Sequence, residues 1–163
     1  APYTLDRAFA FVGDNTIAMG FPDIIFEPAD AFSDLIKRQT ETGADVVLGL
    51  FPTQRPENVD MVALEADGRV RQIHIKPSST DLVSTWLIAL WQPAFTHYLH
   101  SFVRRHRNAI HQEAEAVPEL FIGEVIQAAI DSGLHVDSVS FKTGRYIDIG
   151  TPPDILTAVQ IYN

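Results

Sequence analysis

Two aspartates stand beside apolar segments, where a carboxylate needs a ligand or a partner. Asp23 follows the apolar run 17–21 and a proline. If that run is a strand of an open α/β sheet, Asp23 lies just beyond its end, where such sheets bind ligands. The other interpretation is that Asp23 only opens a turn. Asp148 interrupts the short segment 146–149, and burying a carboxylate there is costly unless it is paired, hydrogen-bonded or bound to a metal ion.

The elements that would position Asp23 alternate between strand and helix. The run 17–21 shows no polar alternation, which is typical of a parallel strand covered on both faces. A helix with one apolar stripe is predicted from Pro28 to Gly43, and the run 44–51 indicates a second buried strand. Strand, helix and strand in succession form the βαβ pattern. We therefore expect an α/β fold with a three-layer, Rossmann-like mixed sheet, mainly parallel.

The middle of the chain predicts antiparallel structure. The segment 53–60 is polar and turn-prone and indicates a surface loop. Asp67 and Gly68 separate two alternating segments, which predicts a hairpin whose two turn residues both have positive φ. The other expected elements are, in order, a helix at 4–12, a strand at 85–91, a helix at 94–105, a helix after Pro118 and a strand at 134–141.

The segment 144–158 combines Asp148 with the start of a helix. Thr151 suits the N-cap, Pro152 the first helical position, and Asp154 the acidic partner of a capping box. Helix initiation explains these three residues, so we do not expect them to be catalytic. Asp148 has no such explanation.

Length and composition limit the classes of protein. The 163 residues suit one domain spanning 1–163, and no apolar run approaches the ~20 residues of a membrane helix, which predicts a soluble protein without membrane contact. A net charge of −9 argues against a nucleic-acid surface. The absence of cysteine fits a reducing compartment, so cytoplasm is expected. The first residues resemble the interior of a domain, which predicts the C-terminal part of a longer polypeptide.

Two segments that carry the aspartates resemble the sugar-1-phosphate nucleotidylyltransferases, the pyrophosphorylases that make nucleotide sugars. The segment 17–26 is similar to the family strand that ends in a metal-binding aspartate, here Asp23. The sequence YIDIGTPPDILTA at 146–158 is similar to the family's Asp-x-Gly-Thr-Pro segment, and it places Asp148 on the second metal-binding aspartate. The second match is the more specific.

Two further segments between them extend the resemblance over most of the chain. The sequence IHIKP at 73–77 is similar to the family's Glu-Lys-Pro signature, so Lys76 matches the lysine that contacts the substrate phosphate. The segment 86–95 is similar to the strand and helix start that line the sugar pocket, which makes Trp86 a candidate substrate-binding residue. Without the resemblance, Lys76 is a solvated strand end before a proline.

The resemblance implies a reaction and its participants. A sugar 1-phosphate would attack the α-phosphorus of a nucleoside triphosphate and release pyrophosphate. Asp23 and Asp148 would hold Mg²⁺, which one or two carboxylates bind together with phosphates and water. Lys76 would place a positive charge on a phosphate oxygen. The fold would be of the nucleotide-diphospho-sugar transferase type, incomplete at the N-terminus, and a homo-oligomer is compatible with it.

Three departures from the family pattern affect these expectations. Ile75 stands where the family usually has glutamate, so one acceptor for sugar or ribose hydroxyls is missing. Leu87 occupies the place of a small glycine in the sugar pocket. The family's glycine-rich loop with its Gly-Thr-Arg signature would precede Ala1. This loop would hold the triphosphate and the base, so the chain alone is expected to have little activity.

Two rival functions remain open at this stage. His97 and His100 have the i, i+3 spacing of a helical zinc site, and His106 and His111 follow, but no cysteine or suitably spaced carboxylate joins them. The second rival is a sugar-nucleotide-binding or regulatory domain of the same fold without catalysis.

Overall fold

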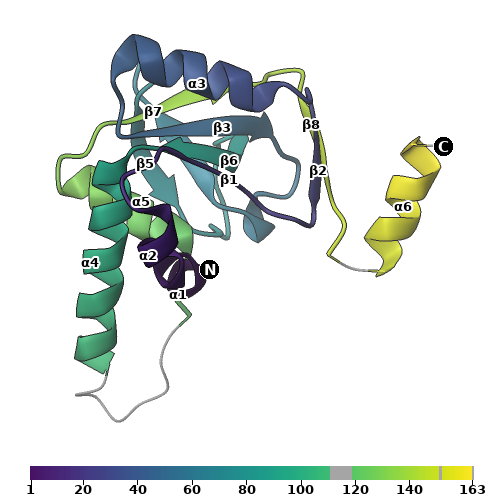
Figure 1. Ribbon diagram of the computed structural model, residues 1–163. Coiled ribbons are helices and arrows are strands. Elements are labelled where there is room, and N and C mark those ends of the chain that lie inside the picture. The colour runs from purple at the N-terminus through teal and green to yellow at the C-terminus, as the bar shows by residue number, and fades with distance from the viewer. Residues whose placement is uncertain (111–118, 151, 163) are drawn as a thin grey trace.

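A computed structural model describes residues 1–110, 119–150 and 152–162 of the chain. Its largest element is a six-stranded sheet in which the neighbouring strands run in the order β5-β4-β6-β3-β7, with β1 paired to β6 beside this path (Figure 1). The strands are β1 (Ile17–Gly20), β3 (Val46–Pro52), β4 (Met61–Leu64), β5 (Val70–His74), β6 (Ser84–Trp91) and β7 (Val136–Ser140). A separate two-stranded sheet pairs β2 (Ile24–Glu27) with β8 (Arg145–Asp148).

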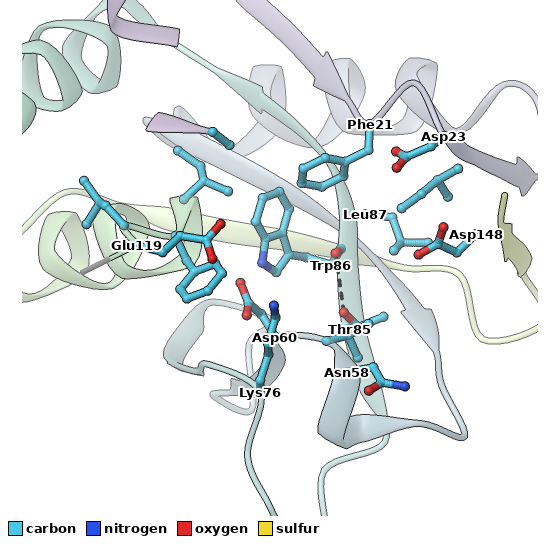
Figure 2. Close-up of a pocket in the computed structure, with 16 residues that line it drawn as sticks. Phe21, Asp23, Asn58, Asp60, Lys76, Thr85, Trp86, Leu87, Glu119 and Asp148 are labelled. Atoms are coloured by element: carbon cyan, nitrogen blue, oxygen red, sulfur yellow. Dashed lines mark hydrogen bonds between the residues drawn. The ribbon is translucent and has the colours of Figure 1, made fainter. Parts of the chain in front are cut away.

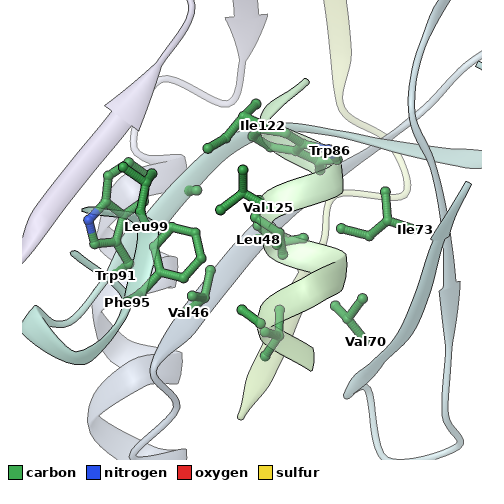
Figure 3. Packing of buried hydrophobic residues seen from close by; sticks show 14 of the residues in the cluster. Val46, Leu48, Val70, Ile73, Trp86, Trp91, Phe95, Leu99, Ile122 and Val125 are labelled. Atoms are coloured by element: carbon green, nitrogen blue, oxygen red, sulfur yellow. The ribbon is translucent and has the colours of Figure 1, made fainter. Parts of the chain in front are cut away.

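Helices cover both faces of the large sheet, which confirms the three-layer α/β architecture (Figure 1). One face carries α3 (Ala31–Thr42), whose Leu35 packs with Val47 and Phe51. The opposite face carries α4 (Pro93–Ile110) and α5 (Ile122–Asp131). Figure 3 shows this second core, in which Val125 of α5 and Phe95 of α4 lie against the strand residues Val46 and Leu48.

The remaining helices lie near the two ends of the described chain. They are α1 (Pro2–Arg7), α2 (Phe9–Val12) and α6 (Pro152–Tyr162), and a short 3₁₀ turn spans Pro56–Asn58. The single opening helix that was expected is broken at Ala8 into α1 and α2. Residue 151, the expected N-cap of α6, and residues 111 and 118 lie outside the described part of the chain.

The expectation of a mainly parallel sheet is wrong for the strands described. Only β3 and β7 are parallel, and β1 runs antiparallel to β6 with Ile17 opposite Trp91. In β1 only Met19 is buried, and the outward-facing positions Ala18 and Gly20 are small and apolar. A half-exposed strand therefore shows the uninterrupted apolar pattern that is typical of a strand covered on both faces.

The predicted hairpin is present, but its turn is one residue longer than expected. Glu65 and Arg69 close the turn, because the Glu65 N–H donates to the Arg69 carbonyl at 2.8 Å. Gly68 has φ 93°, and Asp67 is not among the described residues with positive φ. One glycine in the left-handed region is what a three-residue turn with a bulge requires. The register of β4 and β5 shifts accordingly between Ala63 and Leu64.

A buried ion pair between Arg38 and Asp137 connects α3 and the hairpin turn to β7. The Asp137 side chain is only 2% exposed, and its Oδ1 accepts hydrogen bonds from Nε and Nη2 of Arg38 at 3.1 and 3.0 Å. The same guanidinium donates to the Asp67 carbonyl, and the Ser138 hydroxyl donates to the Gly68 carbonyl. These contacts join three segments that are distant in the sequence.

We expect Arg38→Met to lower the free energy of unfolding by about 3 kcal/mol, because it leaves the buried carboxylate of Asp137 without its cation. The matched control is Arg69→Met, which breaks the exposed pair of Arg69 with Asp67 and should change stability little. Chemical denaturation of both variants measures the difference. Equal losses would show that the Arg38 pair contributes no more than a surface contact.

Candidate active site

The structure brings Asp23 and Asp148 together through the small β2–β8 sheet. Asp23 lies between β1 and β2, and Asp148 is the last residue of β8. Ile24 is paired with Asp148 in the antiparallel register, and the Ile149 N–H donates to the Asp23 carbonyl at 2.8 Å. Residues 24–27 were not predicted as a strand, so the partner that aligns the two aspartates could not be seen in the sequence pattern.

Both carboxylates converge on Gly150. A Cβ atom added to Gly150 would lie 3.0 Å from Oδ1 of Asp148 and 3.4 Å from Oδ2 of Asp23. The Gly150 N–H donates to Oδ1 of Asp148 at 2.8 Å, which fixes that carboxylate. Both aspartates are exposed, so Asp148 does not carry the burial cost that its apolar neighbours suggested. Two exposed carboxylates directed at one point suit a divalent cation that keeps several other ligands.

Lys76 lies across the same pocket in an unusual backbone conformation. Its φ of 39° falls in the left-handed region, which side chains other than glycine rarely adopt. Its ammonium group lies 4.4 Å from the centre of the Phe121 ring, a cation–π contact that leaves the exposed Nζ available to solvent or ligand. Strained backbone of this kind gathers at binding sites, where the surrounding structure holds it in place.

Aromatic and apolar side chains separate Lys76 from the aspartates. The Trp86 ring lies 5.6 Å from the Phe21 ring, and Leu87 lines the same pocket beside them (Figure 2). Leu87 therefore occupies the region of the pocket in which a small residue was expected. Its side chain leaves less space there than a glycine would. Ile75, the other departure, packs against the large hydrophobic core.

The resulting pocket has a volume of about 260 Å³ and is strongly acidic. Asp23 and Asp148 lie at one end, and Asp60, Lys76 and Glu119 lie around the Trp86 indole (Figure 2). Among the described side chains that line it, four carboxylates face one ammonium group. Binding of an anionic ligand is therefore favoured where Lys76 or a bound cation offsets this charge.

The sequence did not identify Asp60 as a site residue, because the polar segment 53–60 indicated a surface loop. The residue lies directly before β4, level with the strand ends that line the pocket. Burial raises the pKa of the Asp60 carboxyl, and this outweighs the Trp86 indole N–H and the Lys76 charge, which lower the pKa. The hairpin signal at Asp67 and Gly68 could have found it, because counting back along the paired strands places Asp60 opposite Ile75.

This raised pKa predicts that Asp60→Asn becomes more stabilising, relative to the wild type, as the pH rises from about 3 to neutrality. Below the ordinary pKa of an aspartate, ~3.8, Asp60 is protonated in both the folded and the unfolded protein. Its carboxyl group then does not lower the free energy of unfolding. Above the raised folded-state value, the wild type bears the full cost of the buried charge.

Denaturation of both proteins at a series of pH values measures the effect, with Asp67→Asn as the control. Arg69 lowers the pKa of Asp67, so this second substitution should become more destabilising over the same pH range. Parallel pH profiles for Asp60→Asn and the wild type would show that Asp60 carries no such cost.

The described histidines of the candidate zinc site, His97, His100 and His106, do not form a metal site, and His111 lies outside the described residues. His97 Nε2 lies 2.9 Å from Oδ1 of Asp14, and His100 Nδ1 lies 2.6 Å from Oδ1 of Asp6. The two histidines thus bind separate aspartates of the N-terminal segment. No group of three or more histidine, cysteine, aspartate or glutamate side chains suited to a metal ion occurs among residues 1–110, 119–150 and 152–162.

No helix in the described part of the chain has the length and apolar character needed to span a bilayer. A search of curated proteins gives no match to the chain.

Solved structures share the fold at low sequence identity. A protein described as a glucose-1-phosphate thymidylyltransferase of Bacillus anthracis, in complex with sucrose, has a TM-score of 0.75 and 16% identity over 99% of this chain and 60% of its own. The UTP-bound UGPase of Acinetobacter baumannii has a TM-score of 0.71 and 17% identity over 99% and 55%. The inositol-1-phosphate CTP transferase of T. maritima has a TM-score of 0.68 and 18% identity over 96% and 58%.

The chain therefore spans 55–60% of the length of these three structures. A family model described as nucleotidyl transferase matches residues 8–163, which is nearly the whole chain. The match includes Asp23, Lys76, Trp86 and Asp148. The chain belongs to the nucleotidyl transferase family.

Proposed function

We propose that the protein transfers a nucleotidyl group from a nucleoside triphosphate to a sugar 1-phosphate, giving a nucleotide sugar and pyrophosphate. The observation that supports this most strongly is the convergence of Asp23 and Asp148 at one end of a pocket that has Lys76 at the other. The family and the fold agree with the proposal.

The pocket residues suit the separate tasks of this reaction. A Mg²⁺ ion would be held by Asp23 and Asp148 and would neutralise charge on the phosphates as the new bond forms. The donor set fits the ion, because Mg²⁺ takes oxygen ligands and needs only one or two carboxylates when phosphates and water complete its shell. Without a cation, these two carboxylates would repel a triphosphate.

Lys76 would bind the phosphate group of the sugar 1-phosphate, and the Trp86 indole would pack against the sugar ring. In-line attack joins an oxygen of the sugar phosphate to the α-phosphorus while the bond to the departing pyrophosphate breaks. Positioning and charge neutralisation supply most of the catalysis in such transfers, and no covalent intermediate with the protein is needed. These roles leave the base and the sugar unspecified.

The test is a reaction panel with the complete protein encoded by the gene and, separately, with this 163-residue chain. Each common nucleoside triphosphate is combined with each of several sugar 1-phosphates and Mg²⁺, and both pyrophosphate and nucleotide sugar are measured. We expect one preferred pair of substrates, no turnover with EDTA, and little turnover by the 163-residue chain alone. Binding of sugar nucleotides without turnover of any pair would favour the non-catalytic alternative.

A further inference from the structure

The strand register places Asp60 inside the pocket. Met61, the first residue of β4, is paired with His74 of β5 on one side and with Thr85 of β6 on the other. One residue earlier, Asp60 is therefore level with Ile75 and Trp86. The residue stands between the strand end that leads to Lys76 and the indole that forms the centre of the pocket (Figure 2).

The first turn of α5 holds the Asp60 carboxylate from the opposite side. A Cβ atom on Gly123 would collide with Oδ2 of Asp60 and would lie 2.7 Å from Cδ1 of Ile75. Only glycine leaves room for the carboxylate here. The positive end of the helix dipole favours an anion at this place. Asp60 is thus closely fitted between two elements, which argues against a loosely solvated loop residue.

The polar groups around Asp60 do not satisfy all of each other's hydrogen bonds. The Trp86 side chain is buried, with the residue only 4% exposed, and its Nε1 has no hydrogen-bond partner of accepted geometry among the described residues. The indole N–H faces Asp60 (Figure 2), and its weak hydrogen bond and that of the Lys76 backbone both lower the pKa of the Asp60 carboxyl without offsetting its burial. A buried donor without a well-formed partner, beside a partly buried carboxylate that lines the pocket, is a site for a ligand group.

The charges around Asp60 indicate what that ligand group is. Lys76 already supplies a cation to this part of the pocket, so a second cation is not required. Glu124 and the lining residue Glu119 disfavour an anion. An uncharged hydrogen-bond donor remains, and a hydroxyl is the donor that a sugar phosphate carries within reach of its phosphate.

We propose that Asp60 is a specificity-determining residue whose carboxylate accepts a hydrogen bond from one hydroxyl group of the sugar phosphate while Lys76 binds the phosphate. The inference rests on the proposed function for its ligand class. It adds the side chain that distinguishes one sugar from another, at a position where the sequence indicated only a loop.

The test is calorimetric titration of the complete protein with glucose, mannose and galactose 1-phosphates, followed by analogues of the tightest binder that each lack one hydroxyl. One analogue should bind the wild type on the order of 10- to 100-fold more weakly than the parent sugar phosphate, the range for a hydrogen bond to a charged acceptor. Asp60→Ala should weaken the parent by a similar factor and bind that analogue as the wild type does.

Two further measurements separate recognition from a structural effect. Inorganic phosphate should bind Asp60→Ala at least as tightly as the wild type, because a repelling carboxylate is gone and Lys76 remains. Asp60→Asn, which keeps an acceptor oxygen, should recover part of the discrimination and serves if the alanine variant does not fold. Circular dichroism confirms that each variant is folded.

Three results would overturn the inference: equal weakening of all analogues and of phosphate in Asp60→Ala, unchanged discrimination in that variant, or no binding of any sugar 1-phosphate. Discrimination that depends on Asp60 without formation of a nucleotide sugar would support the inference and overturn only the proposed reaction. The two proposals can therefore fail separately.

Discussion

Replacing either Asp23 or Asp148 by asparagine should lower Mg²⁺-dependent turnover of the complete protein on the order of 100-fold or more. Asparagine keeps the size and one acceptor oxygen but removes the charge that the cation requires. Losing one electrostatic contact that acts on the developing charge has an effect of this size in other enzymes. The fold should be retained, because both residues are exposed and repulsion between the two carboxylates is relieved.

The matched control is Glu27→Gln on the same small sheet. Glu27 is paired with Arg145 at the end of the β2–β8 ladder away from the pocket, at 2.6 Å between Oε2 and Nη2. The Glu27→Gln substitution should leave turnover close to the wild-type value. Steady-state rates at saturating Mg²⁺, and again at higher Mg²⁺ to detect weakened affinity, measure the difference. Normal turnover by Asp148→Asn would make Asp148 a structural carboxylate.

Lys76→Met should lower kcat/KM for the sugar 1-phosphate on the order of 100-fold. Methionine has nearly the length of lysine and can keep the contact with Phe121, but it cannot donate to a phosphate. The wild-type KM should also rise with salt concentration, because salt screens the attraction between the Lys76 ammonium group and the phosphate, and the variant should lose most of this dependence.

Lys142→Met is the control for the loss of one positive charge. Lys142 is exposed and does not line the pocket. Its substitution changes the net charge by the same amount as Lys76→Met. If the two variants showed the same kcat/KM, the effect of Lys76 would be that of overall charge, and its direct contact with the phosphate would be refuted.

The sequence predicted best the elements whose pattern has a local physical cause. The run 46–52 is wholly apolar up to its closing proline and forms the interior strand β3, and Gly43 ends α3 in the left-handed conformation, with φ 65°. The hairpin was found from one dipeptide. Each of these features depends on side chains within a few residues, so one sequence is enough to reveal it.

The predictions failed where the structure depends on partners distant in the sequence. The direction of β1 is set by its neighbour β6, about seventy residues away, and no feature of residues 17–20 records that direction. The strand at 24–27 is short and ends in Glu27, whose partner Arg145 is likewise distant. Helix α4 continues to Ile110, past the end at 105 that the sequence predicted.

The site was predicted in part. The motif resemblance selected Asp23, Lys76, Trp86 and Asp148, and all four line one pocket, although their chemical roles remain predictions. Asp60 has no motif and belongs to a polar segment, so only the pairing of β4 with β5 and β6 places it there.

The central claim is that Asp23 and Asp148 together hold a divalent cation for nucleotidyl transfer. A crystal structure of the complete protein with Mn²⁺ and a nonhydrolysable nucleoside triphosphate tests it most directly, because the anomalous signal of Mn²⁺ locates the metal without ambiguity. We expect the metal within about 2.2 Å of an oxygen of each aspartate and in contact with the phosphates, close to the typical distances of Mg²⁺ sites. A metal bound by the phosphates and by neither aspartate would contradict the account.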